Sequence, residues 1–365
     1  MNKDYFKRQI ITYMGNKRKV IGDIQDIIDI LNLGSNIKIA EGFSGSGIVS
    51  RLLKENCNEL YVNDTAGYSK TLSDCYLADP SKTIKNKIKK YIDEANKFAD
   101  NPSTDVPKYI QKYWAPHSKT IKKTDRVYFT YENGKRIDAY RFFIEKLPKK
   151  YRPFLLGPLL VKCSVHTNTS GHFAAYYKEN NKGKYGGKTG TDIKRITKKI
   201  VLEMPLFSEK KAKIHTYRQD VNEWVQKIPK VDIMYYDPPY NKHPYSIFYF
   251  LLDIINEWDI NKDIPDTFRG QPKNWVLSPY NSTKNAEKAF ESLIKNTKAK
   301  NIMISYNNTG IIPPNKLETI LKKYGNLIIF PIEHKTYNKM KGIANYKRKE
   351  EKKKIKEMIY LLDLS

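Results

Sequence analysis

The sequence predicts an α/β fold in which a mainly parallel sheet of the nucleotide-binding type is interrupted by a large insert and closed by an antiparallel hairpin. One apolar run ends in a glycine-rich loop, and a helix and a second apolar run ending in an acid follow it, which is typical of the opening of such a sheet. The middle of the chain lacks a regular alternation of strands and helices. Two strand-like runs close the chain without a clear helix between them.

The first elements are a helix and two strands joined by the glycine loop. Apolar residues at helical spacing predict an amphipathic helix over residues 16–32. The apolar run Ile37–Ala40 predicts the first strand, and Leu60–Val62 predicts the second. Between them, the glycine loop leads into a helix that begins near Ile48.

The middle of the chain, residues 70–205, is rich in Lys, Tyr and Asn and predicts an inserted, mainly helical domain with a loop at Asn181–Gly190. The strands expected after it are Lys213–Thr216, Asp232–Tyr236, Asn301–Ser305, Leu327–Ile332 and Glu357–Leu362, with helices between them such as Ala286–Ile294. We therefore expect residues 1–69 and 206–365 to form one domain around a single sheet. The basic segment 335–355, between the two closing strands, is expected to be a loop or a helix.

Charge is the strongest signal in the composition. The chain has 66 Lys and Arg against 39 Asp and Glu, a formal net charge of +27 that is spread along its length. This excess favours a polyanionic partner, because basic side chains that bind phosphates release condensed counterions. A solvated, lysine-rich surface is the alternative. The three cysteines match no zinc pattern and are too few for a disulfide framework, and no apolar run approaches the roughly 20 residues of a membrane helix, so we expect a cytoplasmic protein without membrane contact.

The glycine loop Phe43–Gly47 is the first candidate binding site. Glycines at a turn from strand to helix let the backbone approach a ligand closely, and the start of the helix offers free N–H groups. Asp64, at the end of the next strand, is placed to bind ribose hydroxyls. Ser50 stands where a dinucleotide-binding loop would have its third glycine, which argues against NAD.

The second site is the run Asp237–Tyr240, directly after an apolar run. It suits a reaction in which the amino group of a nucleobase attacks a methyl donor. The Asp237 carboxylate and the Pro238 carbonyl can accept the two amino hydrogens, and the pair Pro238 and Pro239 stiffens the turn. Tyr240 offers a flat face on which a flipped base can stack. The reaction needs no metal, and we expect none.

These motifs, in this order, resemble the Dam-like family of N6-adenine DNA methyltransferases, of class α order, in the branch common in restriction–modification systems. The resemblance implies a Rossmann-like sheet that binds S-adenosylmethionine. It further rests on Ile11–Lys17, which resembles a segment that contacts the methionine end of the cofactor in the family, with Lys17 matched to the cofactor carboxylate. The residues it assigns to cofactor binding are Tyr13, Lys17, Glu41, Phe43, Ser44, Gly45, Asp64, Asp220 and Asp237.

The same resemblance implies contacts with DNA. The stretch Asn168–Tyr176 resembles part of the family's DNA-facing insert, so we expect contacts from Asn168, His172 and Tyr176; a satisfied structural histidine is the alternative for His172. Ser305–Asn308, after a late strand, either lines the base pocket or is an ordinary turn. The basic closing segment is expected to bind phosphates through Lys339, Lys341 and Arg348.

The sequence thus predicts a site-specific adenine methyltransferase acting on duplex DNA, with a cognate restriction endonuclease as a possible separate partner. Three alternatives remain open at this point. A cytosine-N4 methyltransferase uses the same chemistry but usually carries Ser in place of Asp237. An rRNA adenine methyltransferase would share the fold and the charge. A non-catalytic DNA-binding subunit could have kept the fold without the activity.

Overall fold

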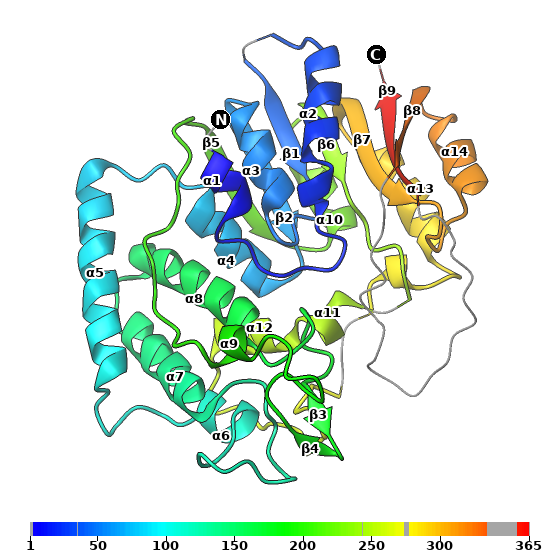
Figure 1. Ribbon diagram of the computed structural model, residues 1–365. Coiled ribbons are helices and arrows are strands. Elements are labelled where there is room, and N and C mark those ends of the chain that lie inside the picture. The colour runs from blue at the N-terminus through cyan, green and yellow to red at the C-terminus, as the bar shows by residue number, and fades with distance from the viewer. Residues whose placement is uncertain (1–2, 35, 243, 274–276, 334–355, 365) are drawn as a thin grey trace.

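The computed structural model describes residues 3–34, 36–242, 244–273, 277–333 and 356–364, and a seven-stranded sheet forms its centre (Figure 1). The strands are β1 (Lys38–Glu41), β2 (Glu59–Asp64), β5 (Lys213–Arg218), β6 (Val231–Tyr236), β7 (Ala299–Asn307), β8 (Asn326–Glu333) and β9 (Lys356–Asp363). Their order across the sheet is β5-β2-β1-β6-β7-β9-β8. All seven strands expected from the apolar runs are present, with ends that differ by at most two residues.

The first five strands in this order are parallel, and the last two close the sheet differently. β9 runs antiparallel to both of its neighbours, β7 and β8, and lies between them. The predicted closing hairpin is therefore confirmed, with its second strand inserted beside the parallel strands. This arrangement is a Rossmann-like sheet with an antiparallel closing hairpin, and it brings the start of β9 beside the end of β7, where Asn307 pairs with Glu357.

Helices cover both faces of the sheet. They are α1 (Lys3–Lys7), α2 (Ile21–Ile30), α3 (Ile48–Glu55), α10 (Val221–Lys227), α13 (Ala286–Asn296) and α14 (Pro314–Leu321). Side chains alternate between the faces along each strand, so Ile39 and Ile233 pack on α1, α2 and α3 while Ala40 and Met234 pack on α10, α13 and α14. The central strands β1, β2, β6 and β7 are buried on both faces, which explains why they appear as apolar runs in the sequence.

The helix expected over residues 16–32 is shorter in the structure. Residues Lys17–Lys19 form a 3₁₀ turn, η1, and α2 begins only at Ile21. The Asn16 side chain accepts a hydrogen bond from the Arg18 N–H and so caps the 3₁₀ turn. Two further 3₁₀ turns are η2 (Lys149–Tyr151) and η3 (Pro279–Asn281). Lys17 therefore lies in the 3₁₀ turn before α2 and not within the helix.

The insert packs beside the sheet as a mainly helical unit with its own core (Figure 1). Its elements are α5 (Lys82–Asp100), α6 (Ile110–Trp114), α7 (Tyr131–Glu145), α8 (Arg152–His166), α9 (Ile193–Thr197), and the small hairpin of β3 (Lys178–Glu179) and β4 (Lys182–Gly183). Three helices join this core from outside the insert or from its edge: α4 (Gly67–Tyr76), α11 (Tyr245–Phe248) and α12 (Phe250–Glu257). The limits 70–205 remain a prediction, and the packing unit extends beyond them.

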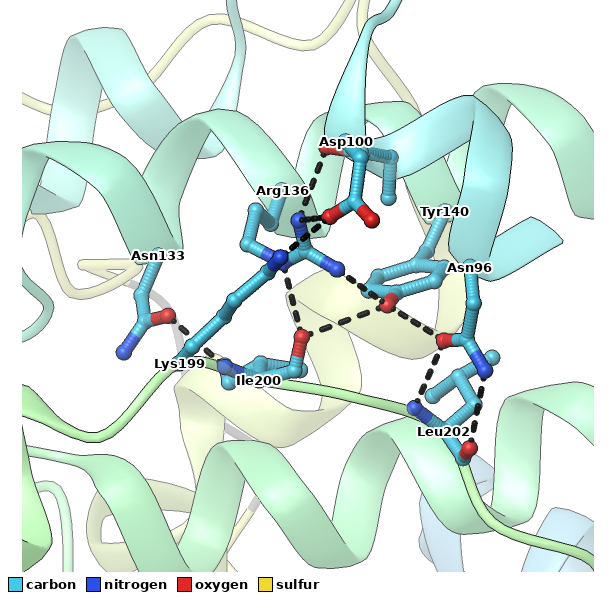
Figure 2. A network of polar contacts seen from close by, with 9 residues as sticks. Asn96, Asp100, Asn133, Arg136, Tyr140, Lys199, Ile200 and Leu202 are labelled. Atoms are coloured by element: carbon cyan, nitrogen blue, oxygen red, sulfur yellow. Dashed lines mark hydrogen bonds and ion pairs between the residues drawn. The ribbon is translucent and has the colours of Figure 1, made fainter.

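A buried polar network fastens the end of the insert to its helices (Figure 2). Arg136 of α7 donates to the Ile200 carbonyl at 2.7 Å and forms an ion pair with Asp100 of α5 at 2.6 Å. Asn96 of α5 exchanges two hydrogen bonds with the main chain of Leu202. The chain segment that returns from the insert to the sheet is thereby held across α5 and α7, which gives this network a structural role.

Across the described ranges of the chain, none of the helices is both long enough and apolar enough to cross a membrane.

Candidate active site

A cavity of about 950 Å³, including its open mouth, lies at the carboxyl ends of β1 and β6. The strand order reverses between these two strands, and ligands of open α/β sheets bind at such a switch point. Its lining contains all the residues that the sequence assigns to the cofactor. These are Tyr13, Lys17, Glu41, Phe43, Ser44, Gly45, Asp64, Asp220 and Asp237. Positions up to 224 residues apart in the chain, from 13 to 237, thus meet at one place.

The glycine loop forms one wall of the cavity. Gly45 has a φ of +50° and Gly47 a φ of +75°, a backbone conformation that side chains with a Cβ rarely adopt. Gly47 donates a hydrogen bond to the Ser44 carbonyl at 2.8 Å and then starts α3. A Cβ on Gly45 would lie 3.0 Å from the Tyr13 ring, so the absence of a side chain lets Tyr13 pack directly on the loop.

Asp64 fixes this loop from the end of β2. One of its carboxylate oxygens accepts the Gly45 N–H at 2.7 Å, and the other accepts the Ala66 N–H at 2.9 Å. Burial raises the pKa of the Asp64 carboxyl, while these hydrogen bonds favour its charged form. Hydrogen bonds from the Ser69 side chain and the Thr65 main chain add to this effect, so four donors of the chain favour the charged carboxylate.

Glu41 is a second buried acid in the lining. Glu41 is the last residue of β1 and is 1% exposed. Its carboxylate accepts a short hydrogen bond from the Ser50 hydroxyl. Burial raises the pKa of the Glu41 carboxyl to about 8, the Ser50 hydrogen bond opposes this rise, and the Asp237 and Asp64 charges add to it. Ser50, which stands where a dinucleotide-binding loop would have its third glycine, therefore has a structural partner in Glu41 of β1.

Asp237 directly follows β6 and forms an ion pair with Lys17, whose Nζ lies 3.0 Å from Asp237 Oδ1. The same ammonium lies 2.6 Å from Glu357 Oε1 of β9. Burial raises the pKa of Asp237 to about 6; Lys17 opposes this rise and Glu357 adds to it. The sequence matched Lys17 to the carboxylate of the cofactor, whereas the structure pairs it with the acid of the Asp-Pro-Pro-Tyr motif.

The other residues of this motif surround the same acid. Pro239 lines the cavity, and the Tyr240 carbonyl accepts the Ile311 N–H at 3.0 Å. The Tyr240 ring packs edge-on against Tyr306, with 5.8 Å between ring centroids, and Lys17 Nζ lies 5.5 Å from its centroid. Tyr306 belongs to the stretch Ser305–Asn308, so that stretch supports the Tyr240 ring from the end of β7.

Aromatic side chains form the opposite end of the cavity. Phe43 packs edge-on against Tyr236 and against Tyr280 of η3. The Tyr280 hydroxyl donates to the Asn222 side chain at 2.7 Å. Asp220 lines this end and caps α10 by accepting the Asn222 N–H at 2.9 Å. A polar rim and aromatic walls at this end suit a purine ring.

The family of the chain follows from comparison with known proteins. Residues 13–320 match the model of the D12 class of N6 adenine-specific DNA methyltransferases, and this span includes the glycine loop and the Asp237 motif. The chain belongs to this family. It is therefore an adenine-specific DNA methyltransferase, which decides against the cytosine-N4, rRNA and non-catalytic alternatives.

Several curated relatives of this methyltransferase cover most of its length. The type II methyltransferase M.NlaIII of Neisseria lactamica is 26% identical over 90% of this chain and 92% of its own. The type II methyltransferase M.CviAII of Paramecium bursaria Chlorella virus 1 is also 26% identical, over 90% of this chain and 92% of its own. The modification methylase StsI of Streptococcus sanguinis is 28% identical over 93% of this chain, which spans only 50% of that relative.

The insert of the methyltransferase places two of the predicted DNA contacts inside its core. Asn168 is fully buried; its amide donates to the Val127 and Lys184 carbonyls and accepts the Gly186 N–H. Tyr176 is 5% exposed and donates to the Asp125 carbonyl. We therefore revise these two predictions, because both side chains support the loop and hairpin and neither reaches the surface.

His172 keeps both interpretations open. It is 9% exposed, accepts the Ala174 N–H at 3.3 Å and packs edge-on against Phe248 of α11. Burial lowers the pKa of its imidazole, and the Arg269 charge adds to this effect. The phosphate contacts predicted for the closing segment fall on Lys339, Lys341 and Arg348, which lie outside the described residues.

Sequence reasoning missed several residues of the site. Tyr245 and Tyr249 pack nearly parallel to the Tyr13 ring, with 5.1 and 4.6 Å between centroids, and the Tyr249 hydroxyl accepts the Met14 N–H. Tyr280 and Glu357 were also missed. The chain has 27 tyrosines, and no pattern distinguishes these three from the others. Glu357 is one acid beside a basic segment and meets the site only through the pairing of β9 with β7.

Proposed function

We propose that this methyltransferase transfers a methyl group from S-adenosylmethionine to N6 of an adenine that is flipped out of a specific duplex DNA site, as the modification enzyme of a restriction–modification system. The observation that carries the proposal is the position of Asp237 in the cavity formed by the glycine loop. An acceptor for the amino group and a loop suited to a nucleoside ligand meet there. Because the target base is stacked inside the duplex, it must leave the helix to reach Asp237.

The charges of the cavity favour S-adenosylmethionine as the cofactor. Glu41, Asp64 and Asp237 all line the cavity, and burial raises the pKa of each carboxyl. Buried carboxylates are stabilised by a nearby cation. The sulfonium and ammonium groups of S-adenosylmethionine are two such cations, so the residues fit it. Asp64 and the Gly45 loop suit its ribose, and the aromatic end beside Phe43 and Asp220 suits its adenine.

The reaction depends on the positioning of the adenine amino group more than on a strong base. When bound, the cofactor supplies an electrophilic methyl group on sulfur. Asp237 accepts one N6 hydrogen of the target adenine and the Pro238 carbonyl accepts the other, which localises the nitrogen lone pair. The lone pair would then face the methyl group that the bound cofactor would supply, and the electron pair of the methyl–sulfur bond would leave with the thioether product. The N6 proton would become acidic once the nitrogen is methylated, and Asp237 is placed to accept it.

The insert and the net charge of +27 support duplex DNA as the substrate. The hairpin β3–β4 presents Lys178, whose Nζ lies over the exposed ring of Phe268. Burial lowers the pKa of Lys178 to about 8, and the Arg269 charge adds to this effect, so an anion such as a phosphate would be stabilised beside these cations. The restriction–modification role rests on the relatives, which are type II methyltransferases and modification methylases.

The test is a comparison of Asp237→Ala with Asp93→Ala, which removes an exposed acid of an i,i+4 ion pair on α5. Single-turnover transfer of labelled methyl from S-adenosylmethionine to duplex DNA would be measured, with cofactor affinity by calorimetry. We expect Asp237→Ala to lose at least about a thousandfold in rate, of the order that removing a preorganised transition-state partner costs, while keeping its fold. Activity within tenfold of the parent would sink the assignment. Asp93→Ala should match the parent.

A further inference from the structure

The buried Lys17 ammonium forms ion pairs with two carboxylates. Its side chain is 3% exposed, and its Nζ lies 3.0 Å from Asp237 Oδ1 and 2.6 Å from Glu357 Oε1. Burial alone would lower the pKa of Lys17, but the two carboxylates raise it well above its usual value. The three residues come from η1, from the end of β6 and from β9, so the contact connects the first and last described parts of the chain.

Glu357 is itself held in place. The Ser305 hydroxyl, on β7, donates a hydrogen bond to Glu357 Oε1 at 2.8 Å. The antiparallel pairing of β7 and β9 sets this contact, because Asn307 pairs with Glu357 and Ser305, two residues earlier on β7, lies on the same face of the sheet. The carboxylate therefore presents a fixed oxygen to Lys17, as expected for a group with a defined electrostatic role.

The charge balance shows what Glu357 adds. Lys17 alone would neutralise Asp237, and a neutralised carboxylate is a weaker acceptor for an amino hydrogen. With Glu357 present, one ammonium is shared by two carboxylates, so Lys17 neutralises Asp237 only in part. Asp237 then keeps negative charge toward the base, while Lys17 still prevents repulsion between the two acids.

We propose that Glu357 is a positioning residue for methyl transfer, which acts by holding Lys17 and thereby sets the orientation and the charge of Asp237. This inference rests on the proposed function. It assigns a role to β9, which carries no recognised motif. Other ionisable groups also act on Asp237. They are Glu41 on β1, Tyr235 on β6, Tyr240 in the motif and Tyr245 on α11.

The experiment compares Glu357→Gln, Glu357→Asp and the parent in single-turnover methylation between pH 5 and 9. Without the Glu357 charge, Lys17 pairs with Asp237 only. Because the Glu357 charge is one cause of the raised Asp237 pKa, this pKa should fall in Glu357→Gln. We expect the acidic limb of the profile of Glu357→Gln to move about one pH unit lower, and the rate at pH 7.5 to fall ten- to a hundredfold. DNA and cofactor affinities should stay within threefold. Glu357→Asp keeps the charge and should return the acidic limb toward the parent.

The control is Glu291→Gln, which removes an exposed ion pair, to Lys323, outside the lining of the cavity. A slower Glu357→Gln enzyme with an unshifted pH profile would show a merely structural role and overturn the inference, as would an unchanged rate. Should Glu357→Gln not fold, Ser305→Ala loosens the same carboxylate and should shift the profile in the same direction. A parent without any methylation would instead defeat the proposed function, so the two failures are distinguishable.

Discussion

Glu41 illustrates how a single buried residue can serve a ligand at a cost to stability. Its pKa rises from 4.5 to about 8 on folding, mainly through burial. An acid whose folded pKa is raised favours the fold in its protonated form. That contribution is complete below the unfolded pKa of 4.5 and is lost as the pH rises through about 8. The ionised residue then destabilises the fold unless a cation binds beside it.

We therefore predict that Glu41→Gln is more stable than the parent at pH 9 and similar to it at pH 4.5, where the parent is protonated in the fold. The gain at pH 9 should be about 1–3 kcal/mol, because each pKa unit is worth about 1.4 kcal/mol and the site relaxes on ionisation. S-adenosylmethionine should bind at least tenfold more weakly. Thermal unfolding at both pH values and calorimetry are the measurements, with the exposed Glu94→Gln as the control. A variant with the parent's pH dependence would show that Glu41 is not protonated in the fold.

The residues of the site differ in how well they could be predicted from the sequence. Asp237 and the Gly45 loop were predictable because their chemistry requires fixed neighbours in the chain: a strand before, a stiff or glycine-rich turn after. The ion pair of Lys17 was not, because its partners lie about 220 and 340 positions away. Asn168 and Tyr176 were placed on the surface because their motif was recognised. The contacts of Asn168 with Val127 and Lys184, and of Tyr176 with Asp125, are not visible in the sequence.

The loop after the hairpin β3–β4 depends on one of those residues. Asn168 accepts the Gly186 N–H at 3.0 Å and donates to the Lys184 carbonyl, so its amide ties the glycine-rich loop to α8 and its neighbours. Gly186, Gly187 and Gly190 all have positive φ, which leaves this loop few conformational restraints of its own. One side chain therefore sets the shape of a segment that sequence analysis placed on the DNA side.

We predict that Asn168→Ala destabilises the fold by about 1–3 kcal/mol, because it leaves buried main-chain groups without partners. DNA affinity should fall several-fold while cofactor affinity stays the same, since the amide lies in the insert and not in the cavity. Chemical unfolding, DNA titration and calorimetry would measure the three effects, with Asn86→Ala, at an exposed position of α5, as a comparison. Weaker cofactor binding with unchanged DNA binding would contradict this division of roles.

The elements of the sheet were predictable and those of the insert were not, for physical reasons. Strands buried on both faces must be apolar throughout, and they appear as runs such as Val231–Tyr236. The strands Lys178–Glu179 and Lys182–Gly183 have two residues each and no such pattern. Helix α12 follows the Asp237 motif in sequence but packs in the core of the insert, which only the three-dimensional arrangement reveals.

The N-terminal segment connects the two halves of the molecule. The Thr12 N–H donates to Ser164 of α8, and the Met14 N–H donates to Tyr249 beside α12, so both contacts are with the insert core. Tyr13 packs on the glycine loop and Lys17 binds Asp237. One stretch of six residues, from 12 to 17, thus touches the helical insert, the cofactor cavity and the catalytic acid.

The central claim is that this molecule methylates N6 of adenine at a defined DNA site. The most direct measurement is sequencing that identifies modified bases in the DNA of a methylation-free host that expresses the chain, with Asp237→Ala as the control. We expect N6-methyladenine at one short recurring sequence, at nearly every occurrence, and none in the control. Methylated cytosine, methylation without a fixed sequence, or equal methylation by Asp237→Ala would contradict the account.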